Sequence, residues 1–195
     1  MKIEFLKLYT RHLRAQKRFY TGKLQLPLIN ETDESFQLKL GYTLLEFEQQ
    51  ASATPYHIAI HIPAFQVEKA LEWLEKRTEI LRDGEDEIID FPAWKARSVY
   101  FYDADQNIVE FISRRDFFPA SSEDFSEKSL LGISEIGLAT DNVEEKFNFL
   151  NRNFGLRKFT GDYERFCATG DDEGLFIIIN KGQKDWIPTG DKAYP

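Results

Sequence analysis

The sequence predicts an α+β fold made of repeated units, each with the order strand, helix, strand, strand, strand (βαβββ). Three observations predict it. The order recurs three times along the 195 residues, at a spacing of about 55 to 75 residues. The strand segments alternate apolar and polar residues, and the helical segments carry an apolar stripe. Because one such unit leaves a face of its sheet uncovered, units must pair.

The first unit covers residues 1–50. Its helix is predicted over Leu13–Tyr20, where the apolar side chains recur at helical spacing, and Thr21-Gly22 ends it. Alternating apolar and polar residues predict the strands of this unit, which cover residues 3–9, 26–32, 35–41 and 42–49.

The second unit covers residues 56–114. Its helix is predicted over Val67–Lys76, and Pro63 precedes it, where proline is tolerated. Its strands are predicted over residues 56–63, 87–91, 97–103 and 107–113. We expect the first two units to pair into one cup-shaped mixed sheet, so that residues 1–114 form the main domain.

Residues 115–130 change in composition and are predicted to form a linker. The third unit covers residues 131–195. It begins with a strand over 133–140, and Asp141 is the expected N-cap of a helix over Val143–Phe154. Three short strands and a tail follow. Because this tail is too short to be a fourth unit, the third must pack on the first pair, borrow strands from the tail, or pair with a second chain as a homodimer.

Composition excludes several classes of function. The formal net charge of −8 argues against a nucleic-acid partner, since phosphate binding needs clustered Lys and Arg. No apolar run approaches the length that crosses a bilayer, and the start lacks the pattern of a signal peptide. Cys167 is the single cysteine, so no internal disulfide forms. We therefore expect a cytoplasmic protein without a membrane partner.

The candidate site comes from two strands of the second unit. Alternation places His57 and His61 on one face of the first strand and the isoleucines on the other. In the last strand it places Glu110 opposite Val109 and Phe111. If the apolar faces of both strands lie under the same helix, His57 and Glu110 project from the opposite face of the sheet.

These features resemble the vicinal oxygen chelate superfamily, which includes glyoxalase I, extradiol dioxygenases, fosfomycin resistance enzymes and bleomycin-binding proteins. The resemblance rests on the βαβββ repeat, on the first-strand pattern H-x-A-x-x-I-P beginning at His57, and on the closing segment YFYDADQNIVEF at residues 100–111. Ala104 and Gln106 depart from the usual D-P-x-G-N turn of the family. The superfamily carries unrelated reactions on one frame, so the resemblance implies a fold more than a reaction.

The resemblance implies a divalent metal ion (Fe, Mn, Zn or Ni) and no organic cofactor. Its ligands would be His57, Glu110 and, from the last strand of the first unit, Glu46. Phe5 occupies the position of His57 in the first unit and cannot bind a metal, and in the third unit Glu135 aligns with His57. The alternative is structural: His57 bonds to a neighbouring strand, and Glu110 pairs with an arginine such as Arg97.

Five further side chains complete the predicted site. His61 is a candidate general base, or a histidine that only lines the cup. Arg97 is a candidate catalytic or substrate-contacting cation beside the aromatic residues Trp94, Tyr100 and Tyr102, which are expected to contact substrate. The alternative is a packed strand with a surface arginine.

Three functions follow from these expectations. The first is a metal-dependent enzyme of the glyoxalase or dioxygenase type, acting on a small oxygen-rich or aromatic molecule. The second is a metal-free protein that sequesters a small molecule in the cup, as bleomycin-binding relatives do, and Phe5 favours it. The third is an interaction module whose third unit makes a homodimer.

Overall fold

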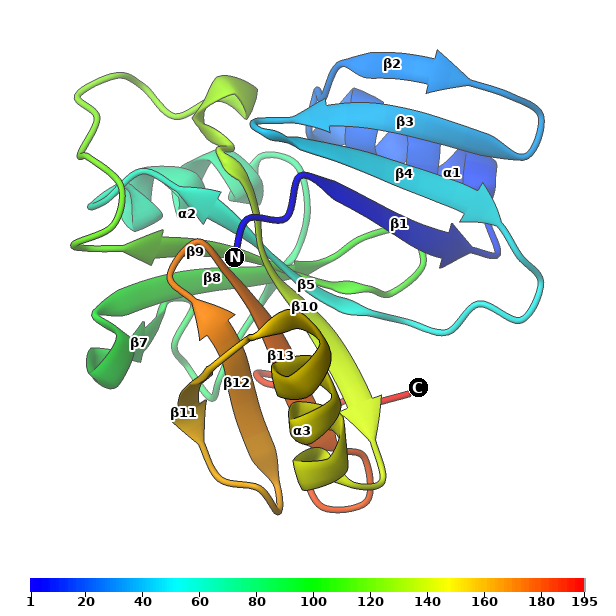
Figure 1. The fold of residues 1–195 in the computed structure, drawn as a ribbon. Coiled ribbons are helices and arrows are strands. Elements are labelled where there is room, and N and C mark those ends of the chain that lie inside the picture. The colour runs from blue at the N-terminus through cyan, green and yellow to red at the C-terminus, as the bar shows by residue number, and fades with distance from the viewer. Residues whose placement is uncertain (195) are drawn as a thin grey trace.

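The computed structural model describes residues 1–194 and shows three βαβββ units (Figure 1). The first unit forms a sheet of its own, in the strand order β1-β4-β3-β2. Its elements are β1 (Phe5–Thr10), α1 (Leu13–Arg18), the π-helical turn η1 (Phe19–Lys23), β2 (Leu28–Glu31), β3 (Ser35–Leu40) and β4 (Thr43–Gln49).

The third unit follows the same order, and the second adds one short strand after its helix, so that β6 and β7 both pair with β8. The second consists of β5 (His57–Ile62), α2 (Val67–Glu75), β6 (Ile80–Leu81), β7 (Ile89–Phe91), η2 (Pro92–Trp94), β8 (Ala96–Tyr102) and β9 (Ile108–Arg114). The third consists of β10 (Gly132–Thr140), α3 (Val143–Phe154), β11 (Lys158–Gly161), β12 (Phe166–Asp171) and β13 (Gly174–Asn180), preceded by the turn η3 (Glu127–Ser129). The predicted α+β class with repeated units is confirmed.

Two helix ends differ from the prediction. The first helix does not end at Thr21-Gly22, because its last turn continues as the π-helical η1. The N-cap of α3 is Asn142 rather than Asp141: the Asn142 side chain accepts a hydrogen bond from the backbone N–H of Glu145.

The second and third units share one nine-stranded sheet. Their first strands, β5 and β10, pair antiparallel and join β6-β8-β9-β5 to β10-β13-β12-β11. The expected pairing of the first two units in one sheet is therefore wrong, and residues 1–114 do not form the cup. We call the face of this sheet opposite α2 the cup.

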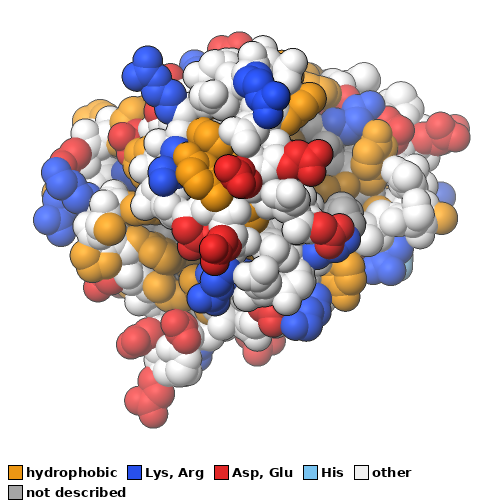
Figure 2. Space-filling view, turned by 60° about the horizontal axis from the view of Figure 1, so that its bottom comes forward, with side chains coloured by type: hydrophobic (Ala, Val, Ile, Leu, Met, Phe, Trp, Pro, Cys, Tyr) orange, Lys and Arg blue, Asp and Glu red, His pale blue; other side chains and the backbone are white. Residues whose placement is uncertain are grey.

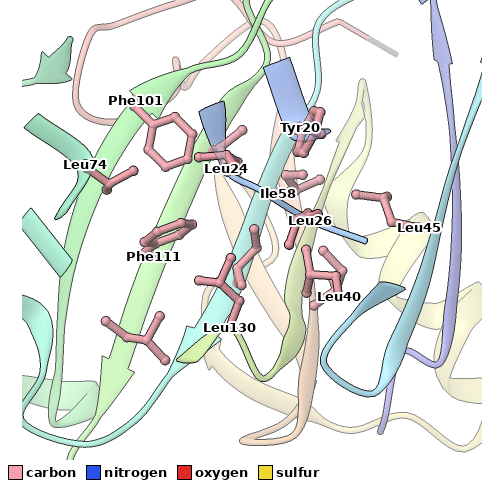
Figure 3. Close-up of a cluster of buried hydrophobic side chains, with 14 of the residues drawn as sticks. Tyr20, Leu24, Leu26, Leu40, Leu45, Ile58, Leu74, Phe101, Phe111 and Leu130 are labelled. Carbon is pink, nitrogen blue, oxygen red and sulfur yellow. The ribbon is translucent and has the colours of Figure 1, made fainter. Parts of the chain in front are cut away.

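The first two units instead share a hydrophobic core (Figure 3). Phe36, Leu45 and Phe47 of the first sheet pack in one buried cluster with Ile58 and Phe111 of the second. Both apolar faces are thus covered when the units stack face to face, which leaves the edge of β5 free for β10. Figure 3 shows Ile58, Phe101 and Phe111 converging with side chains of the first unit.

A buried carboxylate fixes this stacking. Asp103, in the turn between β8 and β9, accepts hydrogen bonds from Gln16 Nε2 (2.7 Å), Tyr20 Oη (2.9 Å) and Asn107 Nδ2 (2.8 Å). Asn107 Oδ1 in turn accepts the backbone N–H of Tyr56 ahead of β5. The D-x-x-x-N segment therefore holds the helix of the first unit against the second.

The surface carries charges of both signs. On the face shown in Figure 2, acidic and basic side chains are interspersed with apolar ones rather than gathered by sign. No helix within residues 1–194 is both long and apolar enough to span a bilayer.

We expect Asp103→Ala to lower the free energy of unfolding by about 2–4 kcal/mol, because three buried donors lose their acceptor. Chemical denaturation measures this. The control is Asp116→Ala, which removes only an exposed ion pair with Lys95. It should lower the free energy of unfolding by less than about 0.5 kcal/mol. Equal losses for the two variants would contradict the role given to Asp103.

Candidate functional site

The candidate site is a pocket of about 300 Å³ in the cup, where the second and third units meet. Its floor is polar and its walls are aromatic. The floor contains His57, Glu110 and Glu135, and the walls include Phe91, Trp94, Tyr100, Phe166 and Trp186.

His57 and Glu110 lie side by side, as their facing in the sequence predicted. His57 Nε2 is 3.1 Å from Glu110 Oε2, and both side chains are buried. Ser98 Oγ donates to Glu110 Oε1 at 2.5 Å. The ring of Trp186 stacks on His57 with a centroid distance of 4.9 Å. Gly137 makes this stacking possible, because a Cβ there would lie 2.7 Å from the Trp186 ring.

Glu135 enters the site from the third unit. The β5–β9 register pairs His57 with Ile108, and the β10–β13 register pairs Glu135 with Leu175. Glu135 therefore takes the place of His57, as the alignment of the units indicated. The last strands compare in the same way. Glu110 of β9 pairs with Ala59 of β5, and Ile177 of β13 pairs with Gly137 of β10. Because Ala59 and Gly137 are at equivalent positions, the third unit has isoleucine where the second has Glu110.

Glu135 is paired with an arginine that the sequence analysis assigned to no site. Arg114 Nη2 donates to Glu135 Oε1 at 2.6 Å, and the Arg114 side chain is only 2% exposed. Burial and the nearby charge of Glu110 raise the pKa of Glu135 to about 8, and Arg114 opposes this rise. Burial, together with the charges of Glu110 and Glu135, also raises the pKa of Tyr100, whose hydroxyl stays protonated.

The prediction of Glu46 as a third metal ligand is wrong. Glu46 lies on β4 of the separate first sheet, because the first unit does not pair with the second. Its carboxylate accepts a hydrogen bond from Gln37 and forms an ion pair with Lys7 at 2.8 Å. The hydrogen bond from Lys7 is the main cause of the lowered pKa of Glu46.

Two predicted catalytic residues lie elsewhere. Arg97 is part of a surface ion-pair network with Glu68 and Asp90, and its side chain is 39% exposed. His61 lies on the cup face but outside the pocket lining, packed against Phe117 and Phe118 of the linker. Burial lowers the pKa of His61 to about 3, which leaves its imidazole neutral and a poor general base at neutral pH.

The predicted substrate contacts divide in the same way. Trp94 and Tyr100 line the pocket, whereas Tyr102 bonds to Asp191 outside it. Sequence reasoning missed Phe91, Phe166 and Lys184 in the lining. Trp186 belongs to the tail of the third unit, which sequence reasoning placed in no site, and it also lines the pocket.

The side chains in the cup do not fit the divalent metal ion that the resemblance implies. The two units place four side chains at equivalent strand positions, namely His57, Glu110, Glu135 and Ile177. Ile177 has no atom that could bind a metal. Glu135 is a poor ligand in either protonation state: protonated it carries no charge, and ionised it is neutralised by Arg114. A buried guanidinium at this position also repels a divalent cation. Across residues 1–194, no three His, Cys, Asp or Glu side chains are grouped as a metal site.

Solved structures share this fold. A protein described as a dioxygenase from Bacillus subtilis matches with a TM-score of 0.67 and 16% identity, over 92% of this chain and 63% of its own length. A glyoxalase I variant from Zea mays matches with a TM-score of 0.60 and 14% identity, over 91% of this chain and 66% of its own. Lactoylglutathione lyase from Agrobacterium tumefaciens matches with a TM-score of 0.50 and 17% identity, over 57% of this chain and 92% of its own.

The chain therefore has the glyoxalase and dioxygenase fold, as the resemblance predicted. It spans less than two thirds of the length of the Bacillus subtilis protein. No family model matches the sequence, and no curated protein matches it. Because identities at this level show the fold and not the reaction, the function must be argued from the pocket.

We expect the stability of the protein to depend on pH through Glu135. The ordinary pKa of this carboxyl group is 4.5, and in the folded protein it is about 8. Between these two pH values, Glu135 of the folded protein keeps a proton that the unfolded chain has lost. The free energy of unfolding therefore falls as pH rises through this window, by on the order of a few kcal/mol. Glu135→Gln removes this component, so its stability falls less between pH 5 and pH 8.5 than that of the wild type. Denaturant titrations over this range measure the difference, with the exposed Glu145→Gln as control; parallel curves for wild type and Glu135→Gln would contradict the assignment.

Proposed function

We propose that the protein binds a flat aromatic small molecule in the cup without a metal ion. The observation that carries the proposal is Arg114. This buried guanidinium, paired with Glu135, places a permanent positive charge beside the side chain that takes the place of His57 in the third unit. Arg114 lies outside the pocket lining, so the acidic side chains of the floor that face the ligand are Glu110 and Glu135.

The walls favour an aromatic ligand. Trp94, Tyr100, Phe166 and Trp186 line a volume of about 300 Å³, at the small end of ligand pockets and suited to one or two rings. Aromatic rings stack in offset or edge-to-face geometries that reward a flat ligand. Phe166 and Trp94 already stand 6.4 Å apart at a shallow interplanar angle of 24°.

The floor favours a hydrogen-bond donor on that ligand. Glu110 accepts one bond from Ser98 and contacts His57, and a carboxylate offers about four lone-pair sites. An amine or hydroxyl on the ring could therefore donate to Glu110. His57 Nδ1 is buried and has no hydrogen-bond partner within residues 1–194.

The test is a thermal-shift screen in the presence of chelator, followed by titration of tryptophan fluorescence. We use three matched probes: a bicyclic aromatic amine, its parent hydrocarbon and its carboxylate. The amine should raise the melting temperature and quench the fluorescence, the hydrocarbon less so, and the carboxylate least. Trp186→Leu should weaken binding of the amine about tenfold, since it removes one stacking face.

Tyr163→Leu, which removes an aromatic ring outside the pocket lining, is the matched control and should bind the amine like the wild type. Binding that occurs only after Fe, Mn, Zn or Ni is added, and that His57→Ala abolishes, would replace this proposal with the metal-dependent enzyme. Absence of any stabilising aromatic probe in chelator would also contradict it.

A further inference from the structure

The charged side chains that line the pocket come from two separate places. Glu110 and Glu135 are the acids of the floor. The segment that follows β13, residues 184–187, contributes Lys184 and Asp185. Within residues 1–194, Lys184 is the only lysine or arginine in the lining. The pocket is therefore acidic on its floor and carries one cation on this segment.

Lys184 has no counter-ion of its own. None of the ion pairs formed within residues 1–194 includes it, whereas the neighbouring Asp185 is held by Lys192 Nζ at 2.8 Å. The ammonium group of Lys184 lies instead 5.7 Å from the centroid of the Phe166 ring, which is itself part of the lining. Because the side chain is half-buried, the pocket presents an ammonium group that is free to meet an anion.

The free cation and the acid of the floor lie on opposite sides of the cup. Glu110 is on β9, and Phe166 is on β12 beneath the Lys184 ammonium. Strands β5, β10 and β13 separate β9 from β12, and neighbouring strands lie about 4.8 Å apart. Trp186, from the same segment as Lys184, stacks on His57 of β5 between these two sides. A flat molecule that lies against Trp186 therefore has the acid at one end and the ammonium group at the other.

We propose that the ligand of the cup is an aromatic zwitterion, with an ammonium group that donates to Glu110 and a carboxylate that accepts from Lys184. This inference rests on the proposed function, which places the ring between the aromatic walls. Glu135 is already paired with Arg114, which leaves Glu110 as the acid that faces the ligand. Each end of the ligand then meets the opposite charge. A carboxylate that lacks the ammonium group leaves Glu110 uncompensated and stays a weak ligand.

Three matched bicyclic compounds test the proposal by titration of tryptophan fluorescence in chelator. The first carries an aminomethyl group, the second adds a carboxylate at the far end of the ring system, and the third carries that carboxylate beside the aminomethyl group. The second should bind about tenfold more tightly than the first, because it gains a charge-assisted hydrogen bond to Lys184. The third should gain nothing, since its carboxylate lies beside Glu110.

Variants of the lysine assign this preference to its charge. Lys184→Met keeps the stem over Phe166 but removes the charge, so it should bind the first and second compounds with equal affinity. Lys184→Arg should retain the preference. Lys181→Met is the matched control, because Lys181 pairs with Asp141 outside the pocket lining, and it should also retain the preference. Salt at about 0.5 M should reduce the preference of the wild type.

The outcomes separate this inference from the proposed function. Equal binding of the first and second compounds by the wild type would overturn the zwitterion and leave the metal-free aromatic site standing. A preference that Lys184→Met retains, or that the third compound shares, would also overturn it. If none of the three compounds binds in chelator, the proposed function and this inference are both contradicted.

Discussion

The antiparallel pairing of β5 with β10 is the constraint on which the rest of the structure depends. It joins two βαβββ units along their first strands and so creates the cup. It also brings Glu135 of one unit to the same floor as His57 and Glu110 of the other. Without it, the second and third units would each expose the edge of their first strand.

Charge in the cup follows from that pairing. Two carboxyl groups on one buried floor repel each other when ionised, and the raised pKa of Glu135 expresses this repulsion. Arg114 relieves part of it from the end of β9. The cup therefore balances its charge with side chains alone, and under the proposed function its aromatic walls select the ligand.

Much of the fold could be predicted from the sequence. Apolar stripes gave the bounds of α2 and α3 almost residue for residue, and alternation gave the common facing of His57 and Glu110. Periodicity cannot say which unit pairs with which, because all three units carry the same pattern. The wrong partner for the second unit led directly to the wrong ligand, Glu46.

Other parts of the site were hidden for a different reason. Arg114 stands at the junction of a strand and the linker, where paired basic residues are ordinarily a solvated surface feature. Trp186 lies in a segment without periodicity, and its place over His57 depends on the space that Gly137 leaves on another strand. The most direct test of the account is histidine-selective ¹⁵N NMR of the three histidines during titration with Zn²⁺ or Ni²⁺. The account predicts that the His57 signals do not change while the exposed His12 reports free metal; a metal-induced change at His57 Nε2 at equimolar metal would contradict it.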